Sequence, residues 1–96
     1  MIVAMCKLKL YAPWVHSLKE KRMIVRSVLG KVRNKFSVSI AEVDSMDIHQ
    51  TIIIGFSIVT NETKMANTML DQIISYIEEH TEAELLDIER EVVSDF

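Results

Sequence analysis

Hydrophobic positions recur along this chain with two different periods, one typical of strands and the other of helices. Period-two alternation runs through residues 2–11, 36–41, 51–60 and 83–93, and it predicts four strands. Apolar residues spaced three and four apart predict helices over residues 18–35 and from residue 62 to about residue 80. The predicted order is therefore strand, helix, strand, strand, helix, strand.

The residues between these segments are consistent with the predicted boundaries. Pro13 ends the first strand, because proline has no N–H to donate to a neighbouring strand. Ser17 stands before the first helix with Glu20 three positions later, which is the capping-box pattern. Asn61 is expected to cap the second helix.

The order of elements predicts one α+β domain over residues 1–96. It matches the ferredoxin-like βαββαβ motif, a two-layer sandwich in which two helices cover one face of a four-stranded antiparallel sheet. The expected strand order is 4-1-3-2, and the second face of the sheet is expected to be open.

Composition excludes several classes of protein. The chain has 96 residues, of which 49% are hydrophobic and 26% charged, as in an ordinary globular domain. Cys6 is the only cysteine, so an internal disulfide is excluded, and we expect its thiol to be an inert core group. The longest apolar runs, 1–6 and 52–56, are too short to span a membrane. Lys7 and Lys9 interrupt the first apolar stretch, so we expect no secretory signal and a cytoplasmic location.

Charge is distributed unevenly along the chain. Residues 1–35 carry nine Lys or Arg and one acid, whereas residues 36–96 carry two Lys or Arg and thirteen acids. This asymmetry separates a basic surface from an acidic one and favours an anionic partner. The alternative is that the two halves lie against each other and neutralise internally.

The predicted first helix carries the sharpest candidate site. Lys19, Arg22, Arg26 and Arg33 fall within about 60° of one another around the helix and span about 21 Å. Because a planar guanidinium meets two phosphate oxygens at once, this stripe suits an RNA backbone. The residues predicted to contact phosphates are Lys19, Lys21, Arg22, Arg26 and Arg33, with Lys31 and Lys35 adding long-range attraction. The alternative is a solvated helix face, or one that meets the acidic strand of a neighbouring chain.

The open face of the predicted sheet is a second candidate surface. Tyr11 is the only aromatic expected on its central strands, which disfavours base stacking of the kind used by RNA-recognition modules. Lys7 and Lys9 are expected to pair with Asp87 and Glu89 across the strands. The remaining apolar patch predicts a homodimer. Its predicted interface residues are Val3, Met5, Tyr11, Ile53 and Leu85.

The residues do not form a recognisable catalytic or cofactor-binding pattern. Four potential ligands of a divalent metal ion gather around one loop, but their spacing matches no known site, and such residues are common in turns. They are Glu42, Asp44, Asp47 and His49. His16 and Ser17 are adjacent, which does not suit a base and its nucleophile. We therefore expect a non-enzymatic protein without a metal or cofactor.

Several segments resemble a small bacterial family, the YlxP-like proteins. They are residues 17–22, residues 33–43, Asp47, Gln50, Gly55 and residues 84–91. The chain departs from the family at His49, where an aromatic residue is common. The resemblance implies a ferredoxin-like fold and no known function. It also implies a link to RNA or the ribosome, because the family's genes commonly lie among those for translation initiation and ribosome maturation.

The functional prediction combines these features. We expect a protein that docks on ribosomal or other structured RNA, or on a ribonucleoprotein, through its basic first helix. Phosphate contacts of this kind position an RNA without reading its sequence. The alternative is a dimeric regulatory or assembly module that uses the open sheet face to bind a protein or a small molecule.

Overall fold

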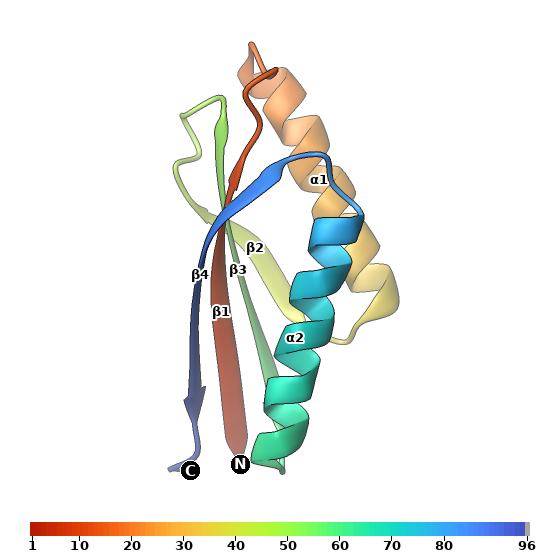
Figure 1. The fold of residues 1–96 in the computed structure, drawn as a ribbon, viewed down its shortest axis with the longest axis vertical. Helices are drawn as coiled ribbons and strands as arrows, with labels where there is room; N and C mark the ends of the chain where they lie inside the picture. The colour runs from red at the N-terminus through yellow and green to blue at the C-terminus, as the bar shows by residue number, and fades with distance from the viewer. Residues whose placement is uncertain (96) are drawn as a thin grey trace.

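The structure is a computed structural model that describes residues 1–95, and Figure 1 shows two helices on one side of a sheet. Its elements are β1 (Ile2–Tyr11), α1 (Leu18–Lys35), β2 (Ser39–Asp44), β3 (Thr51–Thr60), α2 (Thr63–Glu79) and β4 (Glu84–Val93). The sheet is antiparallel throughout, in the order β2-β3-β1-β4. The predicted ferredoxin-like α+β fold is confirmed.

The core lies between the sheet and the two helices. Every second residue of β1 and β3 points into it, which is the physical origin of the period-two pattern. The central strands contribute Ala4, Cys6, Leu8, Leu10, Ile52, Ile54, Phe56 and Ile58. The helices contribute Val25, Val28, Val32, Ala66, Leu70, Ile73, Ile74 and Ile77.

Helix α1 begins at the predicted residue. The Glu20 N–H donates to Ser17 Oγ at 3.1 Å, so Ser17 is the N-cap. The helix ends at Lys35, and Phe36 is its C-cap, with an extended backbone. The Phe36 ring lies edge-on to Tyr76 with 5.5 Å between ring centroids. Strand β2 therefore begins at Ser39 rather than at residue 36, because Phe36 serves the helix end and the interhelical packing.

Two further predictions are wrong, namely the N-cap of the second helix and the uninterrupted alternation of the last strand. The N-cap of α2 is Glu62 rather than Asn61, and the Glu62 side chain makes no capping hydrogen bond. In β4 a bulge interrupts the pairing with β1, since Lys9 pairs with Asp87 but Leu10 pairs with Leu85. Leu86 is the extra residue, and residues on its two sides therefore alternate in opposite phase.

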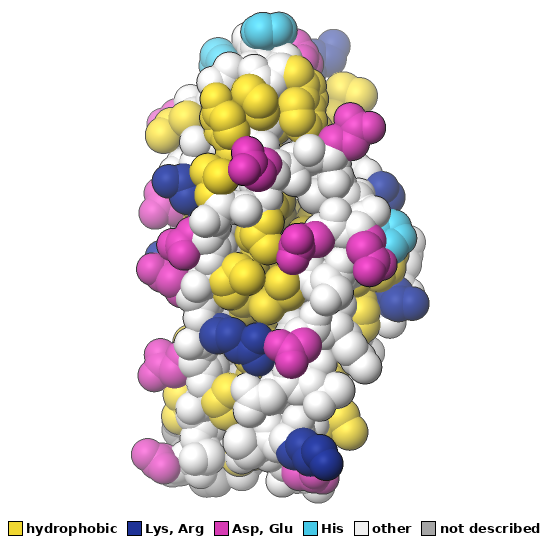
Figure 2. Space-filling model, in the orientation of Figure 1, with side chains coloured by type: hydrophobic (Ala, Val, Ile, Leu, Met, Phe, Trp, Pro, Cys, Tyr) yellow, Lys and Arg dark blue, Asp and Glu magenta, His cyan; other side chains and the backbone are white. Residues whose placement is uncertain are grey.

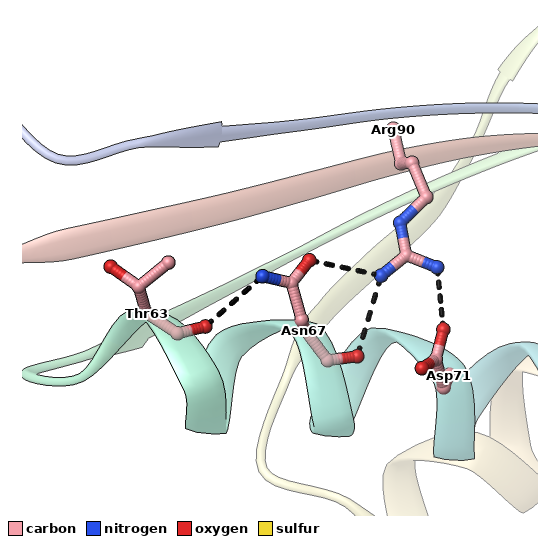
Figure 3. Close-up of polar contacts among 4 residues, drawn as sticks. All are labelled: Thr63, Asn67, Asp71 and Arg90. Atoms are coloured by element: carbon pink, nitrogen blue, oxygen red, sulfur yellow. Dashed lines mark hydrogen bonds and ion pairs between the residues drawn. The ribbon is translucent and has the colours of Figure 1, made fainter.

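Arg90 ties β4 to α2 through three hydrogen bonds (Figure 3). Its Nη1 donates to Asp71 Oδ1 at 2.6 Å, and its Nη2 donates to the Asn67 carbonyl and to Asn67 Oδ1 at 3.3 and 3.2 Å. The Asn67 amide in turn donates to the Thr63 carbonyl at 3.2 Å. The guanidinium thus fixes an edge strand to the helix that covers it.

Replacing Arg90 with methionine is expected to lower the free energy of unfolding by about 1 to 2 kcal/mol, because charge-assisted hydrogen bonds are lost while the aliphatic stem is kept. Urea unfolding of the variant measures this loss. The exposed Asp71→Asn variant should lose less, since it removes only the charge of one acceptor. A loss for Arg90→Met no greater than that of Asp71→Asn would contradict a role for the contacts with Asn67.

Candidate nucleic-acid interface

Three of the predicted RNA contacts are exposed cations on the surface of α1. Lys19, Arg22 and Arg26 all point to solvent. Within residues 1–95, no hydrogen bond or ion pair engages any of these three side chains. Their charges are therefore available to an anion from outside.

Three further basic residues of α1, namely Lys31, Arg33 and Lys35, contact neutral groups and so keep their charge. Arg33 Nη2 donates to the Ile40 carbonyl of β2 at 2.7 Å. Lys31 Nζ donates to the His80 carbonyl at 3.2 Å. Lys35 Nζ lies 5.4 Å from the centre of the Tyr76 ring, a cation–π contact. None of these contacts neutralises the helix.

The basic stripe, by which we mean Lys19, Arg22, Arg26 and Arg33, lies far from the acidic strand. Arg33 reaches β2, and β2 and β4 are the two opposite edges of the sheet. Internal neutralisation does occur on the other face of the sheet, where Lys7 Nζ lies 3.0 Å from Glu89 Oε2. The hydrogen bond and the charge of Glu89 raise the pKa of the Lys7 ammonium. The expected cross-strand pairing is thus confirmed for Lys7, while the stripe is not neutralised.

The prediction that Lys21 contacts phosphate is wrong, because its side chain is buried. Its side chain is 1% exposed, and its Nζ donates to the carbonyls of Ser45 at 2.5 Å and Ile48 at 2.7 Å. Its third neighbour is Glu42 Oε2 at 2.9 Å, an oxygen that is itself buried and accepts no well-directed hydrogen bond. The ammonium of Lys21 compensates the charge of the Glu42 carboxylate. Lys21 therefore fixes the β2–β3 loop and is not available to an RNA.

The β2–β3 loop is also tied to the β1–α1 loop. The Ala12 N–H donates to the Gln50 carbonyl at 2.8 Å, and the Gln50 amide donates to the carbonyls of Pro13 at 3.0 Å and Val15 at 3.3 Å. Ser45 has a φ of 55°, in the left-handed region that few side chains favour. Lys21 and Gln50 thus fix two loops at one end of the molecule, a role that the sequence analysis missed.

The four acidic and imidazole residues near this loop do not gather. Glu42 turns inward to Lys21, away from the exposed side chains of Asp44, Asp47 and His49. In the part of the chain that the structure describes, no group of three or more His, Cys, Asp or Glu side chains is placed to hold a metal ion. No helix within residues 1–95 is long and apolar enough to cross a membrane.

The open face of the sheet holds four of the five predicted interface residues. Register places Val3, Met5, Tyr11 and Ile53 on it, because they alternate with buried neighbours. The placement of Leu85 there is wrong. Leu85 pairs with buried Leu10 and packs against the core, because the bulge at Leu86 shifts its phase.

A groove of about 510 Å³ crosses this face. Four residues with small side chains line it together with Met5, Val43 and Lys7. A side chain at Gly55 would bring its Cβ to 3.0 Å from Val43 Cγ1, so the glycine makes room for Val43, the extra residue at the bulge between β2 and β3. The small residues are Ala41, Gly55, Ser39 and Ser57.

Comparison with known proteins agrees with the resemblance found in the sequence. A curated relative, "Uncharacterized protein YlxP" of Bacillus subtilis (strain 168), is 34% identical over 68 residues, which is 71% of this chain and 74% of the relative. Among solved structures, the de novo designed protein Foldit4 is similar in fold alone, with a TM-score of 0.55 and 12% identity over 99% of this chain and 98% of that one. A family model described as "Protein of unknown function (DUF503)" matches residues 3–90. The chain therefore belongs to the DUF503 family, whose function is uncharacterised, and it is YlxP-like.

Proposed function

We propose that this protein docks on structured RNA, free or within a ribonucleoprotein, through the basic stripe of α1. The observation that carries the proposal is the set of three exposed cations, Lys19, Arg22 and Arg26, that have no polar partner within residues 1–95. Arg33 extends the stripe, since its hydrogen bond to a carbonyl leaves its charge intact.

The geometry of the stripe suits a phosphate backbone. A straight helix holds the four side chains in a row about 21 Å long, enough to meet several consecutive phosphates. Arginines supply two of the three unpartnered cations, and their guanidinium groups bind phosphate oxygens in pairs. The proposed contacts involve no base edges, so we expect recognition by shape and charge.

The test is fluorescence anisotropy with ribosomal and transfer RNA across a salt series. For wild type, three to four phosphate contacts predict that log K falls with log salt at a slope of about −2 to −4. The Arg22→Ala/Arg26→Ala variant should weaken binding and reduce the magnitude of that slope by roughly 1.5 to 2, because two contacts are lost.

The matched control is Lys9→Ala/Lys64→Ala, which removes the same charge from β1 and α2 at exposed positions. It should leave the salt slope near the wild-type value. An equal loss in both variants would mean that net charge alone attracts the RNA. Failure of the wild type to bind either RNA at low salt would rule out the proposal.

A second candidate is the dimeric module, which the groove on the open sheet face supports. Val59 at 67% exposure and Met5 at 40% lie on that face outside the core. Two copies meeting there would bury the apolar patch. Light scattering across a concentration series tests this idea, and a mass of one chain at every concentration would exclude it.

A further inference from the structure

Strand β4 is a long edge strand whose outer backbone groups face solvent. It has ten residues, of which seven are exposed and three half-buried. The sheet continues on one side of it only, through β1. Edge strands of this length expose a row of backbone donors and acceptors to which another strand can pair.

The direction of the outer backbone groups follows from one hydrogen bond, which an added strand would have to replace at Ile88. The Ile88 N–H donates to the carboxylate of its neighbour Asp87 at 2.9 Å, so it points away from β1. In an antiparallel pair, residues whose N–H and C=O point outward alternate with residues whose groups point inward. Arg90 and Val92 therefore share the outer edge with Ile88.

The two faces of β4 differ in chemistry. On the helix side, Ile88 is 42% exposed, and Leu85 and Val92 are half-buried, because α2 covers this edge incompletely. Figure 2 shows hydrophobic side chains in the space between β4 and α2, above a cluster of basic and acidic groups. The open side carries Asp87, Glu89 and Glu91. A strand laid along β4 would meet acidic positions on the open side. On the helix side it would meet the apolar positions Ile88 and Val92, with Arg90 between them turned toward α2.

We propose that the outer edge of β4 binds an extended segment of a partner protein in which basic and apolar residues alternate, and that this segment adds a fifth strand to the sheet. Charge complementarity selects the partner. Glu91 lies opposite Met5 and has no cation across the strand, so a lysine or arginine of the segment would be its counter-ion. The apolar residues of the segment would cover Ile88.

The inner edge of β4 already shows this chemistry. The strand that pairs with it, β1, carries Lys7 opposite Glu89 and Lys9 opposite Asp87, with Leu8 opposite Ile88 between them. Lys7 and Glu89 form an ion pair of 3.0 Å. A partner with the same alternation would repeat the arrangement on the outer side.

A second copy of this chain is a poor fit for the same edge. Its own β4 would bring three acidic side chains against three others, and like charges on paired strands are destabilising. Its β2 is only six residues long, and Arg33 occupies the Ile40 carbonyl of that strand. The acidic pattern therefore disfavours self-association through the β4 edge and leaves this edge to a basic segment.

The experiment uses the ¹⁵N-labelled protein and two capped nonapeptides, one alternating valine with lysine and the other valine with glutamate. We expect the lysine peptide to shift the amide signals of β4 and to slow hydrogen exchange at Ile88, Arg90 and Val92. We also expect it to bind at least about ten times more tightly than the glutamate peptide. This outcome does not depend on whether α1 binds RNA.

Two variants with the same change in charge make the test specific. Glu91→Lys should weaken binding of the lysine peptide at least about threefold, and Glu78→Lys, an exposed change on α2, should leave it unaltered. Equal affinity for the two peptides, shifts centred on α1 or on the groove, or no shifts at millimolar peptide would each overturn the proposal. So would a free protein that is dimeric by light scattering and has its β4 amides already protected.

Discussion

Replacing Lys21 with methionine is expected to lower the free energy of unfolding by about 3 kcal/mol, because it leaves a buried carboxylate without its counter-charge. Glu42 is only 17% exposed on its side chain, and the carbonyls of Ser45 and Ile48 lose their donor as well. For a domain of this size, such a loss would lower Tm by roughly 12 to 20 °C. Urea unfolding and calorimetry measure the two quantities.

The double variant Lys21→Met/Glu42→Leu separates the charge from the packing. Replacing both partners of a buried ion pair by apolar groups is often neutral or stabilising, so the double variant should recover much of the loss. Glu42→Leu alone should also destabilise, because it leaves the ammonium of Lys21 buried with carbonyls only. A Lys21→Met variant within about 0.5 kcal/mol of wild type would show that the ion pair contributes nothing to stability.

The burial of Lys21 could be predicted from its position in the helical period, but the prediction followed its charge instead. Positions 21, 25, 28 and 32 recur at four, three and four, the spacing of one helix face, and the last three are the buried valines of α1. The helical period therefore placed Lys21 in the apolar stripe. Only its charge suggested the RNA surface. Its partners, Glu42 and two loop carbonyls, lie more than twenty residues away, and no local pattern could identify them.

Strong local periodicity explains which elements were predicted correctly. Strands β1 and β3 and helix α1 have the expected bounds, because their hydrophobic periods run over ten or more residues. Between β1 and α1, Pro13 marks the end of the strand and Ser17 the start of the helix. Strand β4 was assigned correctly, but the face of Leu85 was not. One extra residue at Leu86 inverts the alternation on either side of it, and a bulge of this kind depends on pairing with β1 rather than on any local signal.

The candidate site was only partly predictable, because its state of charge depends on contacts between distant parts of the chain, as the bulge in β4 does. The sequence placed Lys19, Arg22, Arg26 and Arg33 on one stripe, and the structure leaves three of them without a polar partner within residues 1–95. Whether acidic residues quench such a stripe depends on the order of strands and on side-chain reach. Because β2 and β4 occupy opposite edges, most of the acidic strand faces β1 and solvent instead.

Raising the pH from 9 to 11 is expected to cost the wild-type protein about 2 kcal/mol more stability than the Cys6→Ala variant. Burial of Cys6, which is 4% exposed, raises the pKa of its thiol from 9.0 to about 11, and the charge of Arg90 opposes this shift. The unfolded chain loses the thiol proton near pH 9, whereas the folded chain keeps it until about pH 11. Over that interval the unfolded state binds fewer protons, so stability falls as the pH rises.

Urea unfolding of both proteins at several pH values between 7 and 11 measures the difference, and the other groups that titrate there are common to both. Below pH 8 the two stabilities should run parallel, offset by the cavity that the substitution leaves. Because the folded thiol holds its proton, an alkylating reagent at pH 8 should modify Cys6 only as fast as the protein opens. Curves that stay parallel up to pH 11 would mean that water reaches the thiol in the folded state, since only a desolvated thiol keeps its proton at that pH.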